Sequence, residues 1–135
     1  MHLSDLNIAA VALAALSNFF IGGIWYSPLL FGKPWMTENG FTPEGMKNRN
    51  MGRIFGLTLV YSLVMAANTA LFLHAFRADL GKALAIAFHG AAGWIIMALF
   101  IIGLFEGRRA RYLLIHAGYI LVSLTTMTMI IAWWG

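Results

Sequence analysis

The sequence has no cysteine and very little charge, and both absences exclude kinds of chemistry. Without cysteine there are no disulfide bonds, no thiolate metal sites and no thiol catalysis. Charged residues make up 10% of the 135 residues, whereas a soluble domain has roughly 25%. No Asp, Glu, Lys or Arg lies inside the long apolar runs. This argues against a pump with a carboxylate relay, although a histidine relay stays open.

Four long apolar runs fill nearly all of the chain, which is 61% hydrophobic. Each run exceeds the roughly 20 residues that cross a bilayer as a helix. Barrel strands would alternate between apolar and polar residues, and these runs do not. The sequence therefore predicts an all-α protein: one integral membrane four-helix bundle over residues 1–135, surrounded by the lipid bilayer. The expected spans are Leu6–Tyr26, Ile54–Phe76, Ala83–Phe105 and Tyr112–Trp134.

All three prolines lie in one loop, residues 27–50, which we expect to be cytoplasmic. Pro28 should end the first helix, because proline disfavours helical geometry in the residue before it. The apolar residues 29–36 predict a short interfacial or re-entrant segment. Thr42 followed by Pro43 is typical of a helix start. The first run lacks a basic leader and a cleavage site, so we interpret it as a retained span and not a signal peptide.

The basic residues predict the orientation. The loop after the first span and its border carry four of the nine Lys and Arg residues, and the loop after the third span carries three. The positive-inside rule places both loops in the cytoplasm and both termini outside. The net charge of +4 therefore reflects topology, and no nucleic-acid partner is expected. Residues expected to anchor the chain at the interface are Trp25, Tyr26, Trp35, Glu106 and Arg108, the last two as an ion pair or a lipid-headgroup site.

The two halves of the chain resemble each other weakly. Residues 30–33 (LFGK) follow the first span much as residues 104–108 (LFEGR) follow the third. This pattern predicts two helical hairpins related as a parallel repeat. Chance similarity among apolar segments is the alternative.

Two segments carry a resemblance to a known family. Residues 25–33 (WYSPLLFGK) form the first, and residues 104–108 with 115–119 (IHAGY) form the second. Over essentially the whole chain the sequence resembles the small bacterial membrane proteins of domain of unknown function 1761 (DUF1761). The resemblance implies a four-helix fold in the bacterial inner membrane and no particular substrate. The family commonly has Asn where His116 stands, so it implies no required metal ligand or proton carrier there.

Polar side chains within spans are the candidates for a site, because each is costly in lipid without a partner. Their expected depths let Asn18, Asn68 and His89 converge on one pocket, with His116 below it. Alternatively, Asn18, His89 and His116 belong to packing faces on which small or polar residues recur about every four positions, with Asn68 on a different face of its helix. The predicted faces contain Ala10, Ala14, Asn18 and Gly22; Ser62, Ala66 and Ala70; Ala85, His89 and Gly93; His116, Tyr119, Ser123 and Thr126.

His89 is expected to be buried between helices and hydrogen-bonded to a neighbouring helix. The histidines are too scattered for a metal or haem site, so no metal and no cofactor are predicted. No acid–base pair or nucleophile has a useful spacing, so an enzyme is the weakest interpretation.

Two functions remain. The first is an oligomeric small-solute or ion binding and transport protein, and the second is a structural or interaction subunit of the envelope without a ligand. A dimer is the expected oligomer, because small-xxx-small pairs exceed what one bundle needs. These pairs are Gly52/Gly56, Ala66/Ala70, Ala83/Ala87 and Gly103/Gly107.

Overall fold

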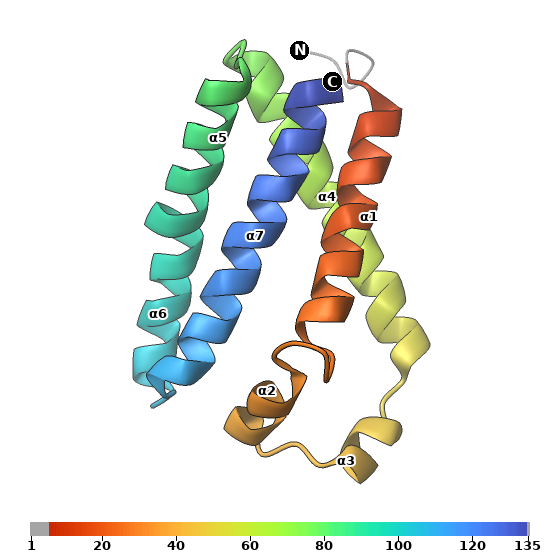
Figure 1. Ribbon diagram of the computed structural model, residues 1–135, viewed down its shortest axis with the longest axis vertical. Helices are drawn as coiled ribbons and strands as arrows, with labels where there is room; N and C mark the ends of the chain where they lie inside the picture. The colour runs from red at the N-terminus through yellow and green to blue at the C-terminus, as the bar shows by residue number, and fades with distance from the viewer. Residues whose placement is uncertain (1–5, 135) are drawn as a thin grey trace.

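Four long helices account for most of residues 6–134, the part of the chain that the computed structural model describes (Figure 1). The third is continuous but contains a π-helical stretch, η2, between two α-helical parts. All four are long and apolar enough to cross a membrane, so the prediction of a helical membrane bundle is confirmed. The spans are α1 (Ile8–Trp25), α4 (Met51–Ala75), α5 (Leu80–His89) with η2 (Gly90–Ile95) and α6 (Ile96–Phe105), and α7 (Ala110–Trp134).

The helix bounds differ from the expected spans by at most three residues, and local capping explains the largest differences. The second and third spans begin at Met51 and Leu80, three residues before the apolar runs. The side chain of Asn50 accepts a hydrogen bond from the Arg53 N–H at 3.0 Å. Asp79 does the same for Lys82 at 2.9 Å. Each cap satisfies a free N–H of the first turn, so the helix starts at the cap and not at the first apolar residue.

The proline-containing loop holds two short helices, α2 (Gly32–Asn39) and α3 (Pro43–Lys47). Thr42 caps α3 by accepting from the Gly45 N–H at 3.1 Å, with proline at the start, as the sequence predicted. Gly40 follows the last residue of α2, and its φ of 66° lies in the left-handed region that glycine adopts without strain. The segment therefore runs along one end of the bundle as ordered structure.

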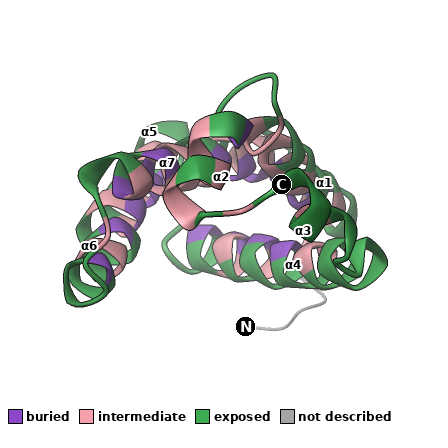
Figure 2. Cartoon of the chain, turned by 90° about the horizontal axis from the view of Figure 1, so that it is seen from below, coloured by how far each residue is buried: buried purple, intermediate pink, exposed green. Residues whose placement is uncertain are grey.

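Helix α7 is the centre of the bundle: it packs against α1, α4 and the α5–α6 span, whereas α4 and α5–α6 pack on α7 and barely on each other (Figure 2). Helix α1 fills the space beside α4 and α7. The buried residues are mainly small, which lets the helix backbones approach closely. The central cluster is Ala14, Ala15, Ala66, Ala70, Leu73, Ala83, Met127 and Ile131.

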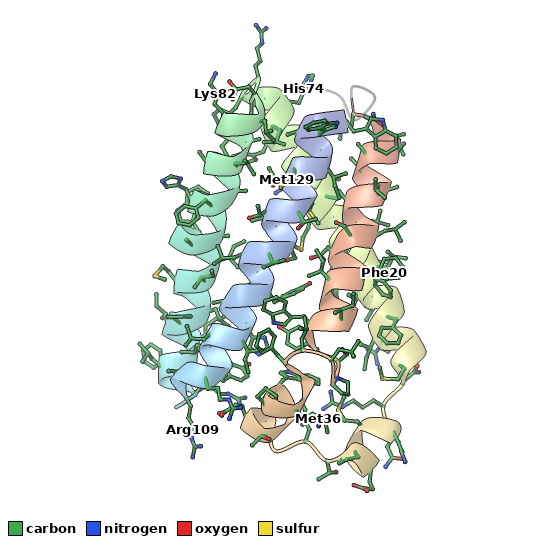
Figure 3. All side chains as sticks on the ribbon, in the orientation of Figure 1. Phe20, Met36, His74, Lys82, Arg109 and Met129 are labelled. Carbon is green, nitrogen blue, oxygen red and sulfur yellow. The ribbon has the colours of Figure 1, made fainter. Side chains whose placement is uncertain are left out.

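Large apolar side chains point outward. Phe20, which Figure 3 labels on α1, is 61% exposed, and Phe105 is 91% exposed. In water such a surface would be unfavourable, but lipid tails are as apolar as these side chains. The bundle therefore has a small-residue interior and a bulky apolar exterior.

The bundle has two ends, which we name the terminus end and the loop end (Figure 1). The terminus end holds the start of α1, the end of α7 and residues 76–79. The loop end holds α2, α3 and residues 106–109. The assignment of the loop end to the cytoplasm stays a prediction.

The π-helical stretch η2 was not predicted from the sequence. It covers Gly90–Ile95 and begins with four small residues, GAAG. A π-helical turn widens the helix and lacks the usual side-chain pattern, so periodicity does not reveal it.

Candidate functional site

The four polar residues expected to share a pocket lie in two different environments. Asn18 is buried among α1, α4 and α7, and His116 is half-buried on the inner side of α7. Asn68 and His89 are exposed on the lipid-facing surface of α4 and α5. The expected convergence of Asn18, Asn68 and His89 is therefore wrong in the single chain.

The predicted burial of His89 is also wrong. Its Nδ1 lies 2.8 Å from the carbonyl oxygen of Ala85, one turn back in the same helix. The buried face of this span holds Ala83, Ala87 and Ala91. Two residues along a helix correspond to about 200° of rotation, so the stripe of Ala85 and His89 faces away from α7.

Asn68 lies in a lipid-facing groove between α4 and the α5–η2 segment, with α7 as its floor. The groove has a volume of about 190 Å³, and its walls are mostly apolar, with Phe72 and Trp94 among them. In lipid, an amide in this position lacks a hydrogen-bonding partner.

Asn18 joins three helices through hydrogen bonds. Its Nδ2 donates to the Ser62 Oγ of α4 at 2.7 Å. Its Oδ1 accepts from the Tyr119 hydroxyl of α7 at 3.1 Å. Gly22, one turn along α1, leaves room for the Tyr119 ring: a Cβ there would lie 3.4 Å from Cε2. The small-residue stripes of α1 and α4 thus form the packing faces predicted for them.

The polar side chains continue toward the loop end through Tyr26 and His116. The Tyr26 hydroxyl lies 2.6 Å from the Nδ1 of His116. The rings of Tyr26 and Tyr119 are 5.5 Å apart, which places the pair directly below the Asn18 bonds. The Tyr112 ring packs edge-on against His116 at 4.4 Å.

Trp25 fixes the end of α1 against α7. Its Nε1 donates to the Ile115 carbonyl oxygen at 2.9 Å, and its ring lies over Gly118. Trp25 and Tyr26 were expected only as interface anchors. The structure instead places both half-buried at the α1–α7 contact, where they hold the polar side chains in position.

A polar cavity lies at the loop end, and one of its lining residues, Arg108, contacts Tyr112. The Arg108 guanidinium lies 4.7 Å from the centre of the Tyr112 ring. Its Nε lies 3.2 Å from the Glu106 Oε2, the ion pair expected in this loop. The cavity has a volume of about 590 Å³, and Figure 3 places Arg109 at the same end. Its lining residues are Thr37, Glu38, Glu106, Gly107, Arg108 and Arg109.

One buried atom in this arrangement lacks a partner. The Nε2 of His116 is shielded from solvent and forms no hydrogen bond with the described residues. Buried polar atoms are nearly always paired, so an unpaired one calls for a further ligand or water. We name the set Ser62, Asn18, Tyr119, Tyr26 and His116 the polar column.

Sequence reasoning gave Tyr26 only the role of an interface anchor and placed Tyr119 and Ser62 on packing faces, so none of the three was expected in the polar pocket. A signal was present for Tyr119, which follows His116 by three residues and therefore shares its helix face. Tyr26 gave no such signal, because its partner is 90 residues away in the chain. Within residues 6–134, no three His, Cys, Asp or Glu side chains are grouped to hold a metal ion.

Comparison with known proteins gives a family and nothing closer. Residues 9–132 match the family model described as Protein of unknown function (DUF1761). No curated protein and no solved structure matches the chain significantly.

Proposed function

The chain belongs to the DUF1761 family, and we propose that it binds a small polar solute or ion at the polar column and transports it across the bacterial inner membrane. The observation that carries this proposal is the unpaired, buried Nε2 of His116. Leaving such an atom unpaired costs about 1–3 kcal/mol. A ligand or water with one hydrogen-bonding group at this point would remove that cost.

Either tautomer of His116 presents one hydrogen-bonding site to the ligand. If Nδ1 accepts from the Tyr26 hydroxyl, Nε2 carries the proton and donates; in the other tautomer Nε2 accepts. The loop-end cavity, with Arg108 beside Tyr112, gives the entry side. We orient this end toward the cytoplasm.

The interior on the other side of the column is closed. Above Asn18 the helices meet through Ala14, Ala66 and Met127, which are fully buried. No static pore continues through this packed layer, so transport in our proposal requires the helices to rearrange.

A binding screen on matched variants tests the proposal. Thermal unfolding in detergent is measured with a panel of inorganic ions, small carboxylates, amines and polyols. A ligand present at one hundred times its Kd stabilises the folded state by about 2.7 kcal/mol. We expect at least one compound to stabilise the wild type and His116→Asn, which keeps a hydrogen-bonding group. The same compound should not stabilise His116→Leu.

His89→Leu is the matched control, since His89 faces lipid and lies apart from the column. It should respond to the compound as the wild type does, and proteoliposomes should take up the compound with the same dependence on residue 116. A stabilising compound that acts equally on His116→Leu would contradict the site. A compound that stabilises the protein but is not taken up by proteoliposomes would support the binding part of the proposal and contradict the transport part.

We propose the homodimer as the working form. Asn68 supports this, because its lipid-exposed amide in the α4–α5 groove would gain a polar partner from a second copy. The small-residue pairs support it less than expected, since Ala66/Ala70 and Ala83/Ala87 are buried within one chain. A monomeric mass in nanodiscs would refute the dimer.

An envelope subunit without a ligand is the alternative function, and a screen with no stabilising compound would favour it.

A further inference from the structure

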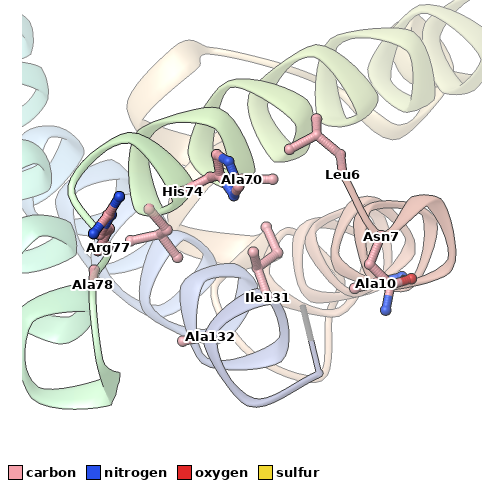
Figure 4. A pocket seen from close by; sticks show the side chains of 10 residues that line it. Leu6, Asn7, Ala10, Ala70, His74, Arg77, Ala78, Ile131 and Ala132 are labelled. Atoms are coloured by element: carbon pink, nitrogen blue, oxygen red, sulfur yellow. The ribbon is translucent and has the colours of Figure 1, made fainter. Parts of the chain in front are cut away.

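A second cavity lies at the terminus end, and Figure 4 shows the side chains that line it. It is an open cavity lined by the start of α1, the last two turns of α4 with residues 77–78, and the end of α7, and has a volume of about 370 Å³. Its inner wall is apolar: Ala10, Ala70, Leu73 and Ile131 line it. Asn7, His74 and Arg77 give it polar and basic groups, and no acidic residue lines it in the described part of the chain.

Asp79, the acidic residue nearest to Arg77 in the sequence, contacts Lys82 instead. Asp79 caps α5 by accepting from the Lys82 N–H, and its Oδ2 lies 3.8 Å from the Lys82 Nζ. The charge of Arg77 is therefore not neutralised by Asp79 within the cavity. The side chain of Asn7 already forms hydrogen bonds within the protein. Its Oδ1 accepts from the Ala10 N–H, and its Nδ2 donates to the Trp134 carbonyl oxygen.

The backbone of Arg77 adopts a conformation that favours glycine. Its φ is 45°, the only left-handed non-glycine residue in the described chain. Two other helix ends have the same closing turn, and both use glycine: Gly40 after α2 and Gly107 after α6, each with φ of 66°. In each turn the next N–H donates back to a carbonyl five residues earlier; Ala78 donates to Leu73 at 3.0 Å.

Glycine would serve this turn with less strain, because a Cβ disfavours the left-handed conformation. Residues in unfavourable backbone conformations cluster at functional sites, and the side chain of Arg77 lines a cavity. The strain alone does not identify the ligand; the lining does.

We propose that the terminus-end cavity binds an anionic amphiphile, namely a phospholipid whose phosphate contacts Arg77 and His74 and whose acyl chain lies against the apolar inner wall. Arg binds phosphate through charge-assisted, often bidentate hydrogen bonds. Neighbouring Trp133 and Trp134 are exposed at the same end, and tryptophan favours the headgroup depth of a bilayer. A basic pocket between spans at that depth matches the chemistry of a phospholipid headgroup.

Native mass spectrometry of the detergent-solubilised protein tests this proposal. Equal amounts of palmitoyl-oleoyl phosphatidylglycerol and phosphatidylcholine are added, and the bound lipid is counted. We expect the wild type to retain phosphatidylglycerol in preference. Arg77→Gly should reduce this retention about tenfold, the loss of one charge-assisted contact, and Arg77→Lys should reduce it less.

Two comparisons separate a specific site from general charge or misfolding. Lys47→Ala removes one positive charge at the loop end without touching the cavity lining or the Asp79–Lys82 pair, and should retain the lipid as the wild type does. Arg77→Gly should unfold at a higher temperature than the wild type, because the left-handed strain is relieved. Loss of lipid by a more stable protein cannot be attributed to unfolding.

Three results would overturn the proposal. The first is unchanged retention of phosphatidylglycerol by Arg77→Gly. The second is equal retention of phosphatidylcholine by the wild type. The third is complete displacement of the lipid by millimolar inorganic phosphate, which would make the ligand a free anion that does not use the apolar wall.

Discussion

At the scale of single residues, the spans contain two matched pairs with opposite environments. Asn18 and His116 belong to the polar column, whereas Asn68 and His89 face lipid. The two asparagines form one pair and the two histidines form the other. Comparing the members of a pair separates the effect of position from that of residue type. The asparagine pair tests stability, and the histidine pair tests ligand binding.

We predict that Asn18→Ala destabilises the fold by about 1–2 kcal/mol, because it removes two interhelical hydrogen bonds and leaves Ser62 and Tyr119 without their partner. Unfolding in mixed micelles with increasing SDS measures this change.

Asn68→Ala serves as the control for that experiment. It removes an exposed amide and should leave the stability of the monomer unchanged or slightly raised, since alanine is the better helix former. Equal destabilisation by both substitutions would contradict the assigned environments of the two asparagines.

At the scale of helices, close approach at particular glycines fixes how the elements meet. A Cβ on Gly32 would lie 2.5 Å from the backbone carbon of Ser27, in the turn between α1 and α2. On Gly118 it would lie 2.7 Å from Cζ2 of the Trp25 ring, which is held by its bond to α7. On Gly103 it would meet only the end of the Leu113 side chain.

We therefore predict graded costs for alanine at these glycines. Gly32→Ala should be the most destabilising, at about 3 kcal/mol, because backbone must move; Gly118→Ala should cost about 2 kcal/mol and Gly103→Ala about 1 kcal/mol. The measurement is unfolding in mixed micelles.

Gly23→Ala is the control for this series, because a Cβ at Gly23 has no neighbour within 4 Å. It should be neutral or stabilising by up to about 1 kcal/mol. A cost at Gly23 as large as that at Gly118 would show that helix propensity or lipid contact, and not the contact with Trp25, dominates.

At the scale of the whole molecule, the two ends of the bundle differ in chemistry. The loop end contains the ordered helices α2 and α3, the polar cavity and the Glu106–Arg108 ion pair. The terminus end contains the second cavity with Arg77 and His74. In our proposal the ligand reaches the polar column from the loop end, because Arg108 of that cavity contacts Tyr112, which packs against His116.

We predict that the loop end faces the cytoplasm, because the loops there carry seven of the nine basic residues, four and three. Single cysteines at Lys47 and Lys82 test this, and the absence of native cysteine makes the background clean. In intact cells a membrane-impermeant maleimide should label Lys82→Cys and not Lys47→Cys. The opposite pattern would invert the molecule and the entry side of the column.

The sequence by itself determined the fold class, the positions of the four spans and the short helix that starts after Thr42. These are local properties: run length, turn residues and caps act within a few residues of the chain. Only the tertiary structure decided which face of each helix lies inside. In water a hydrophobic face marks the interior, but in lipid both faces are apolar, and two small-residue stripes on one helix look alike. Hence Asn68 and His89 were expected inside and lie outside, and Tyr26 was expected to anchor and instead pairs with His116.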